Sequence, residues 1–185
     1  KQFLDKAAMK ELYTGRAHAP LWFNPKKDNK KAHAVVSLLE DSWTHGLNPE
    51  DYHAKELARL LKSPFGGRQA RLELLMTDAV ARYGRDMTGM RVNAEDLRLK
   101  SEFWRQPQDA AEIFHNIATA SDPVKALENL KPQNRLYDIL RKELVKLSKE
   151  ESNYDHLLPI DLNSHHFKPG DRHKDVAAIR ARLGV

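Results

Sequence analysis

The clearest feature of the chain is an apolar stripe that follows a loop at residues 63–67. Its apolar residues are spaced at i, i+3, i+4, i+7, i+8 and i+11, which matches one face of an α-helix with 3.6 residues per turn. We therefore predict the strongest helix here and expect it to form the centre of the core. The stripe consists of Leu72, Leu75, Met76, Ala79, Val80 and Tyr83.

Two weaker helical patterns precede this stripe. Residues 3–17 repeat apolar positions at helical spacing, and Gly15 lies close to their end. A second helix is expected from an N-cap at Asp28 to His45. Its apolar stripe is predicted to consist of Ala32, Val35, Val36, Leu39 and Trp43.

Residues 46–52 are predicted to stop the second helix and to start a turn. Gly46 is placed to adopt the left-handed conformation that ends many helices, and Leu47 can close the apolar side of this cap. The next residues are a turn or the first turn of another helix, since proline is favoured at a first helical position. This segment includes Asp51 and Tyr52.

Between the first two predicted helices, residues 20–23 are expected to be extended and to carry the bulky Trp22.

Three further helices are predicted in the second half, at about residues 107–120, 122–130 and 133–149. In the middle one, Pro123 follows a capping Asp122, an order typical of a helix start. The helical periodicity of the last one comes from Leu136, Leu140, Leu144 and Leu147.

The helical periodicity disappears from residue 154 to residue 170, and a last helix is predicted at about residues 172–183. No β-type alternation of comparable length occurs. The predicted fold class is therefore all-α. We expect an irregular helical bundle for residues 1–150, a linker for residues 151–170 and a short C-terminal helix within residues 171–185.

The balance of charges bears on the possible partners. The 185 residues include 31 Lys and Arg against 26 Asp and Glu, which gives a formal net charge of +5. This surplus favours nucleic acid, anionic lipid or an anionic wall polymer. A basic helical module that binds nucleic acid or a protein is therefore the alternative function. The densest cluster, which is most simply interpreted as a solvated loop, is Lys26, Lys27, Lys30 and Lys31.

Composition excludes several kinds of chemistry. The chain has no cysteine, so it holds no disulfide, no thiolate metal site and no cysteine nucleophile of its own. Its apolar runs are far shorter than the roughly 20 residues of a membrane span, so we expect no transmembrane segment. The first residues contain neither an initiating Met nor an apolar signal core, and we expect a mature or trimmed chain.

Several short strings occur in order along the first 150 residues. HGLNPEDY at 45–52 is followed by LLMTDA at 74–79 and, after Tyr83, by GMRV at 89–92. In order and spacing they resemble the helical scaffold domain of one family, the peptidoglycan L,D-transpeptidases. Further strings that fit this pattern are APLW at 19–22 and LENLKP at 127–132, followed by Tyr137 and Leu140.

A second stretch, at residues 167–184, is similar to the opening of a peptidoglycan-binding module. Pro169 and Gly170 make its turn, and Asp171 can cap the helix that follows. Only the first helix of such a module is expected here. Its apolar stripe consists of Val176, Ile179 and Leu183.

The resemblance implies an exported protein that works at the periplasmic cell wall. Peptidoglycan and a catalytic domain of the same protein would be its partners. The family's catalytic domain carries a Cys nucleophile with a nearby His, and this chain has no Cys. We therefore predict a non-catalytic scaffold or wall-binding part of the enzyme, with no catalytic residue, cofactor, metal or nucleic-acid partner.

The tryptophans allow two interpretations. Indole rings can stack on sugar faces, but in a small helical protein they more often plug the core, with the ring N–H hydrogen-bonded at its edge. We favour the core interpretation. The three residues concerned are Trp22, Trp43 and Trp104.

Other polar residues suggest competing hypotheses. A metal site would need three or four well-placed ligands. The candidate histidines fall in or next to the segment without periodicity: His156, His165, His166 and the nearby His173. Glu73 or Glu95 could be the acid of a helical muramidase, although neither has a recognisable setting. Asp78 is polar within the most apolar helix. Because a buried carboxylate needs partners, we predict a structural clamp that holds a neighbouring loop.

Overall fold

The computed structural model describes residues 3–24, 29–63, 65–89, 91–92, 95–98, 105–151, 167–168, 170 and 173–183. Within these ranges the regular structure is helical throughout, with no strand, so the predicted all-α class is confirmed. The α-helices are α1 (Lys6–Gly15), α2 (Lys30–Glu40), α3 (Ala54–Leu61), α4 (Gly67–Thr88), α5 (Ala110–Thr119), α6 (Pro123–Glu128), α7 (Arg135–Glu151) and α8 (Lys174–Leu183). Short 3₁₀ helices are η1 (Asp41–His45), η2 (Pro49–Tyr52) and η3 (Glu95–Leu97).

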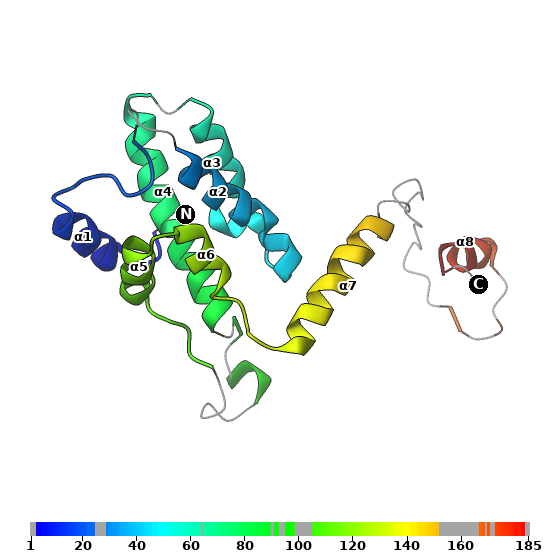
Figure 1. Cartoon of the computed structure of the whole chain (residues 1–185). Helices are drawn as coiled ribbons and strands as arrows, with labels where there is room; N and C mark the ends of the chain where they lie inside the picture. The colour runs from blue at the N-terminus through cyan, green and yellow to red at the C-terminus, as the bar shows by residue number, and fades with distance from the viewer. Residues whose placement is uncertain are drawn as a thin grey trace. The chain divides into compact units, whose positions relative to one another are not determined.

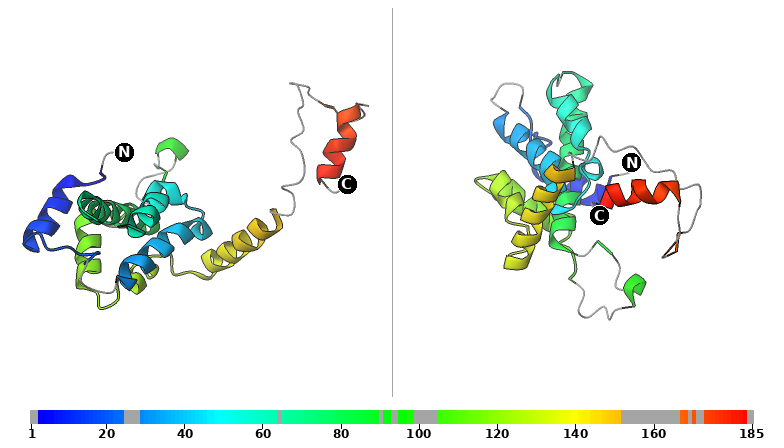
Figure 2. Two further views of the ribbon diagram at one scale, coloured as in Figure 1. Left: turned by 90° about the horizontal axis from the view of Figure 1, so that it is seen from above. Right: turned by 90° about the vertical axis from the view of Figure 1, so that its right-hand side faces the viewer.

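The chain divides into two compact units, Lys1–Arg141 and Lys142–Val185, and the division falls within α7. In the first unit α4 runs through the middle, with α1 and α5 on one side and α2 and α3 on the other (Figures 1 and 2). The main core joins α4 to α2, α3 and the buried pair Trp22 and Phe23. A smaller cluster joins α1, α4 and α5. None of the helices described is both long and apolar enough to cross a membrane.

Helix α4 forms the centre of the core, as its apolar stripe predicted. All six residues of the stripe are buried. The helix is buried on more than this one face, because three polar residues beside the stripe are also inaccessible: Glu73, Thr77 and Asp78. A polar group buried in this way needs hydrogen-bond partners, and α4 obtains them from distant segments.

The first two helices start later than predicted. Helix α1 begins at Lys6 because the Asp5 side chain accepts a hydrogen bond from the Ala8 N–H at 2.9 Å and so caps the helix. Helix α2 begins after Asn29. The predicted cap, Asp28, lies outside the described residues, as do Lys26 and Lys27.

The prediction that Trp43 belongs to the buried stripe of α2 is wrong. The α-helix ends at Glu40 and continues as the tighter 3₁₀ helix η1. Since a 3₁₀ helix has three residues per turn, the positions after residue 40 rotate away from the stripe. Ser42 and Thr44 are therefore buried, while Trp43 is 37% exposed.

Gly46 ends η1 in the left-handed conformation, with φ of 72° and ψ of 19°. The Gly46 N–H donates to the Trp43 carbonyl at 2.9 Å, and the Leu47 N–H donates to the Ser42 carbonyl at 3.3 Å. These two bonds form a Schellman cap, in which the residue after the glycine packs back on the helix. Leu47 is accordingly buried.

We predict that Gly46→Val lowers the free energy of unfolding by more than about 1 kcal/mol, because a β-branched residue is strained at positive φ. The space around the glycine is open, so the cost is conformational and not a clash. Thermal unfolding of the variant measures this effect. Gly15→Val is the control, because Gly15 has equally open surroundings and no positive φ. Equal melting temperatures of the two variants would contradict the prediction.

Gly89 ends α4 at a close approach to another segment. A Cβ atom at this position would lie 2.5 Å from the backbone N and Cα of Pro107. Only glycine permits this contact without moving the backbone. Residues 107–109, which lead into α5, are thereby held against the end of α4. The contact is reinforced by a 3.0 Å hydrogen bond from the Gln108 N–H to the Thr88 hydroxyl.

The later helices occur where they were predicted. Asp109 caps α5, and Asp122 caps α6 by accepting from the N–H groups of Val124 and Lys125. Helix α7 starts and ends two residues later than its predicted range of about 133–149. All four of its leucines are exposed: Leu136, Leu140, Leu144 and Leu147.

In the second unit α8 covers most of its predicted range. Val176 and Ile179 on this helix are half-buried. Gly170 has a positive φ of 97°, whereas Asp171 lies outside the described residues. At the helix start, His173 Nδ1 accepts a hydrogen bond from the Asp175 N–H at 3.2 Å.

Candidate functional site

Glu73 on α4 holds the extended segment that precedes α2. Its carboxylate accepts hydrogen bonds from the backbone N–H groups of Leu21, Trp22 and Phe23, the last two at 3.2 Å. The Tyr13 hydroxyl donates to the same carboxylate at 2.9 Å. One buried side chain therefore ties α1 and residues 21–23 to the central helix. The sequence suggested Glu73 only as a catalytic acid and did not indicate this structural role.

Thr77, one turn further along α4, completes this cluster. The Trp22 ring N–H donates to the Thr77 hydroxyl at 2.9 Å, and the hydroxyls of Tyr13 and Thr77 lie 2.7 Å apart. Trp22 is buried, so the structure places this indole in the core and satisfies its N–H there. Burial, followed by the nearby charge of Glu73, raises the pKa of the Tyr13 phenol well above its ordinary range.

Asp78 makes a second connection from α4, on the side of the N-terminal segment. One carboxylate oxygen accepts from the Leu4 N–H at 2.6 Å. The other accepts from His53 Nε2 at 2.8 Å and from Arg82 Nε at 2.6 Å. Burial alone raises the pKa of Asp78, but hydrogen bonds from His53, Arg82 and Leu4 outweigh it and hold the pKa below its ordinary value. Asp78 therefore holds the N-terminal segment at Leu4 against α4.

A polar network joins two of the strings that carry the family resemblance. The Tyr52 hydroxyl donates to Asp86 Oδ2 at 2.7 Å. Arg91 bridges this pair to Asp51, with nitrogen–oxygen separations of 3.4 Å to Asp86 and 3.5 Å to Asp51. Arg91 is thus connected to Asp51 directly and to Tyr52 through Asp86 on α4. These four residues and Arg85 line a polar pocket.

The LENLKP string and Tyr137 meet His45 and Tyr83 at a second polar pocket. His45 stacks on Tyr137, with ring centroids 5.9 Å apart, and its edge faces Tyr83. The Arg141 guanidinium donates to the Thr44 hydroxyl at 3.0 Å on the same wall. The cavity has a volume of about 530 Å³ and is also lined by Glu128, Asn129 and Lys131.

Burial, followed by the positive charges of Arg141 and Lys131, lowers the pKa of His45 to about 4 from its ordinary 6.5. Protonation of His45 therefore favours the unfolded chain. We predict full stability above pH 6.5 and a loss of roughly 3 kcal/mol as the pH falls from 6.5 to 4.

Urea unfolding at several pH values between 4 and 7 measures this slope for the wild type and for His45→Asn. The variant should lose most of the pH dependence in this window. His33→Asn, at an exposed histidine of α2, is the control and should keep it. Parallel slopes for His45→Asn and the wild type would contradict the assignment.

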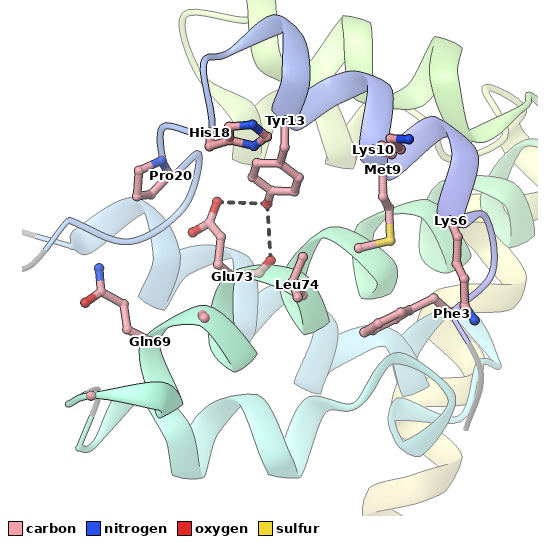
Figure 3. Close-up of a pocket in the computed structure, with 12 residues that line it drawn as sticks. Phe3, Lys6, Met9, Lys10, Tyr13, His18, Pro20, Gln69, Glu73 and Leu74 are labelled. Carbon is pink, nitrogen blue, oxygen red and sulfur yellow. Dashed lines mark hydrogen bonds between the residues drawn. The ribbon is translucent and has the colours of Figure 1, made fainter.

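An apolar hollow lies between α1 and the N-terminal half of α4 (Figure 3). Its volume is about 600 Å³. In Figure 3, Met9 and Tyr13 point from α1 towards Leu74 and Glu73 on α4, and Phe3 closes one end. We call this hollow the α1–α4 groove. Its remaining lining residues are Lys6, Lys10, His18, Pro20, Gly66, Gln69 and Ala70.

Only some of the remaining candidate residues lie in the described part of the chain. Glu95 is exposed on η3, away from the buried Glu73. Trp104 and the histidines His156, His165 and His166 lie outside the described residues. In the part of the chain that is described, no three His, Cys, Asp or Glu side chains are grouped as metal ligands.

Comparison with known proteins identifies one domain. A protein-family model described as Scaffold domain matches residues 7–144. This range holds nearly all of α1, the helices α2 to α6, and the buried carboxylates Glu73 and Asp78. It also holds every residue that lines the two polar pockets except Leu4. Neither the curated proteins nor the solved structures include a match to the chain.

Proposed function

Because the chain belongs to the Scaffold domain family, we propose that it is the non-catalytic scaffold part of a peptidoglycan L,D-transpeptidase. In this role it positions a catalytic domain of the same protein at the cell wall. Peptidoglycan is the second partner, and the periplasm is the proposed location. The cross-linking of stem peptides belongs to the catalytic domain.

One observation supports this proposal most strongly. The strings that resemble the scaffold domain of that enzyme family lie far apart in the sequence but meet around α4. Tyr52 contacts Asp86 next to Arg91, and His45 contacts Tyr137. Such contacts explain why these residue types occur together, since each one completes a hydrogen bond or ion pair of another.

The buried carboxylates support a positioning role. Glu73 and Asp78 each accept several hydrogen bonds, and each ties a segment more than 45 residues away in sequence to α4. A carboxylate held in this way fixes its surroundings. The first unit therefore has the rigid centre that a positioning part requires.

The proposal is tested by sedimentation of the chain with purified peptidoglycan sacculi, with duplex DNA as competitor. We expect the chain to sediment with sacculi and DNA to leave the bound fraction unchanged. The alternative, a basic nucleic-acid-binding module, predicts DNA binding that weakens steeply with salt, because phosphate contacts release counterions. DNA binding of this kind without retention on sacculi would overturn the proposal.

A second expected result concerns activity. The isolated chain should form no cross-links from disaccharide-peptide substrates, because it has no cysteine to supply the thiolate nucleophile of the family. Mass spectrometry of the reaction products detects cross-linked dimers directly. A complete L,D-transpeptidase assayed in parallel is the positive control. Dimers formed by the chain alone would contradict its assignment as a non-catalytic part.

A further inference from the structure

The α1–α4 groove combines apolar walls with a size typical of ligand sites. Its volume of about 600 Å³ lies within the roughly 300 to 1,000 Å³ of small-molecule pockets. Leu74 reaches its edge and is 37% exposed, although the neighbouring residues of α4 are largely buried. The walls are formed chiefly by the apolar groups of Phe3, Met9, Tyr13, Pro20, Ala70 and Leu74.

Two of the polar groups that line the groove, the Glu73 carboxylate and the Tyr13 hydroxyl, are already engaged. The Glu73 carboxylate receives the backbone N–H groups of residues 21–23 and the Tyr13 hydroxyl. The Tyr13 hydroxyl also contacts Thr77. An extended peptide in this groove would find few free partners for its many N–H and C=O groups, chiefly the Gln69 amide and the His18 ring, and each group left without a partner costs free energy. An alkyl chain has no such groups and matches the walls.

The charges at the rim of the groove are positive. Lys6 and Lys10 lie one turn apart on α1 and are exposed. Among the described residues, neither ammonium group has a carboxylate partner within ion-pair distance. A negative head group placed at this rim would interact favourably with both lysines.

From these observations we propose that the α1–α4 groove binds a free long-chain carboxylate, with its alkyl chain between α1 and α4 and its head group at Lys6 and Lys10. The site is separate from the Asp51–Arg91 network and from the His45 pocket, and it goes beyond the proposed scaffold role. Its occupant is a single amphiphilic molecule.

Isothermal titration of the full chain with oleate, kept below its micellar concentration, tests the site. Oleyl alcohol has the same alkyl chain without the charge and tests the lysines. An acidic amphipathic helical peptide tests the competing occupant, a protein partner. We expect one oleate per chain, with oleyl alcohol at least about fivefold weaker and the peptide without saturable binding.

Two pairs of variants locate the binding. Leu74→Glu introduces a charge into the groove, and Leu140→Glu makes the same change on the exposed face of α7. Lys6→Glu/Lys10→Glu reverses the rim charge, and Lys125→Glu on α6 is its control. We expect Leu74→Glu to weaken oleate binding at least about tenfold, because a charge replaces apolar contact. The double lysine variant should weaken it at least about threefold, and the controls should be unchanged.

Two outcomes would overturn the proposal. If oleate binds Leu74→Glu and Leu140→Glu equally, its site is elsewhere on the chain. If the peptide saturates the groove and oleate does not, the groove is a protein-binding surface. Because Leu74 is partly exposed, we expect circular dichroism to show that Leu74→Glu is folded. If this variant does not fold, the Lys6→Glu/Lys10→Glu variant still tests the site.

Discussion

Glu73→Ala is expected to lower the free energy of unfolding by about 3 to 5 kcal/mol, the largest effect of any single change considered for this chain. The substitution removes the acceptor for three backbone N–H groups of residues 21–23 and for the Tyr13 hydroxyl. Trp22 and Phe23 are buried, so water does not readily replace the carboxylate. Each buried donor left without a partner costs about 1 to 3 kcal/mol.

Urea unfolding monitored by tryptophan fluorescence measures the effect. Glu73→Gln should lower the free energy of unfolding by an intermediate amount. Its amide keeps one acceptor oxygen but directs an NH₂ group towards other donors. Glu95→Ala, at an exposed glutamate of η3, is the matched control and should change stability by less than about 0.5 kcal/mol. If Glu73→Ala and Glu95→Ala unfold at the same urea concentration, the carboxylate is not a clamp.

The position of α4 could be predicted from the sequence, but the partners of its polar residues could not. The 3.6-residue period over residues 72–83 identified both the helix and its place in the core. Glu73, Thr77 and Asp78 interrupt that apolar run, and all three are buried. A polar residue within an apolar run indicates a buried group that needs hydrogen-bond partners. Such a role was predicted for Asp78 but not for Glu73 or Thr77. The acceptor of the N–H groups of residues 21–23 depends on tertiary packing, which periodicity does not encode.

The Trp43 prediction failed for a local reason. A stripe extrapolated at 3.6 residues per turn assumes one helix type from residue 30 to residue 45. The Schellman cap at Gly46 is preceded by a 3₁₀ segment, and this change of pitch turns Ser42 and Thr44 inward instead. The glycine was predictable from its position, but the change of pitch before it was not.

The residues that make up the candidate sites could be predicted only in part from the sequence. Strings such as HGLNPEDY and GMRV indicated which residues belong together, but not that Asp86 and Arg91 connect Tyr52 to Asp51. The α1–α4 groove left no sequence signal, because its walls come from residues that also look like ordinary core positions of two helices. A groove depends on how far apart two helices lie, which the pattern of each helix alone does not determine.

Asp78→Ala is expected to lower the free energy of unfolding by about 3 to 4 kcal/mol, because it removes the negative member of a buried ion pair and the acceptor of a buried backbone N–H. The Leu4 N–H, His53 and Arg82 all lose their acceptor. Asp78 is 1% exposed, so solvent gives little compensation. Asp96→Ala, at an exposed aspartate of η3, is the control and should be nearly neutral.

The pH dependence separates the charge of Asp78 from its packing. Its pKa in the folded chain is below the ordinary 3.8, so its stabilisation is complete above about pH 4 and is lost as the pH falls through the folded value. The wild type should therefore lose stability below pH 4 more steeply than Asp78→Ala, in a window distinct from that of His45. Urea unfolding at pH 2 to 5 compares the two slopes. If the difference in stability between the two proteins stays constant down to pH 2, the ionised carboxylate contributes nothing and the cost of Asp78→Ala comes from packing alone.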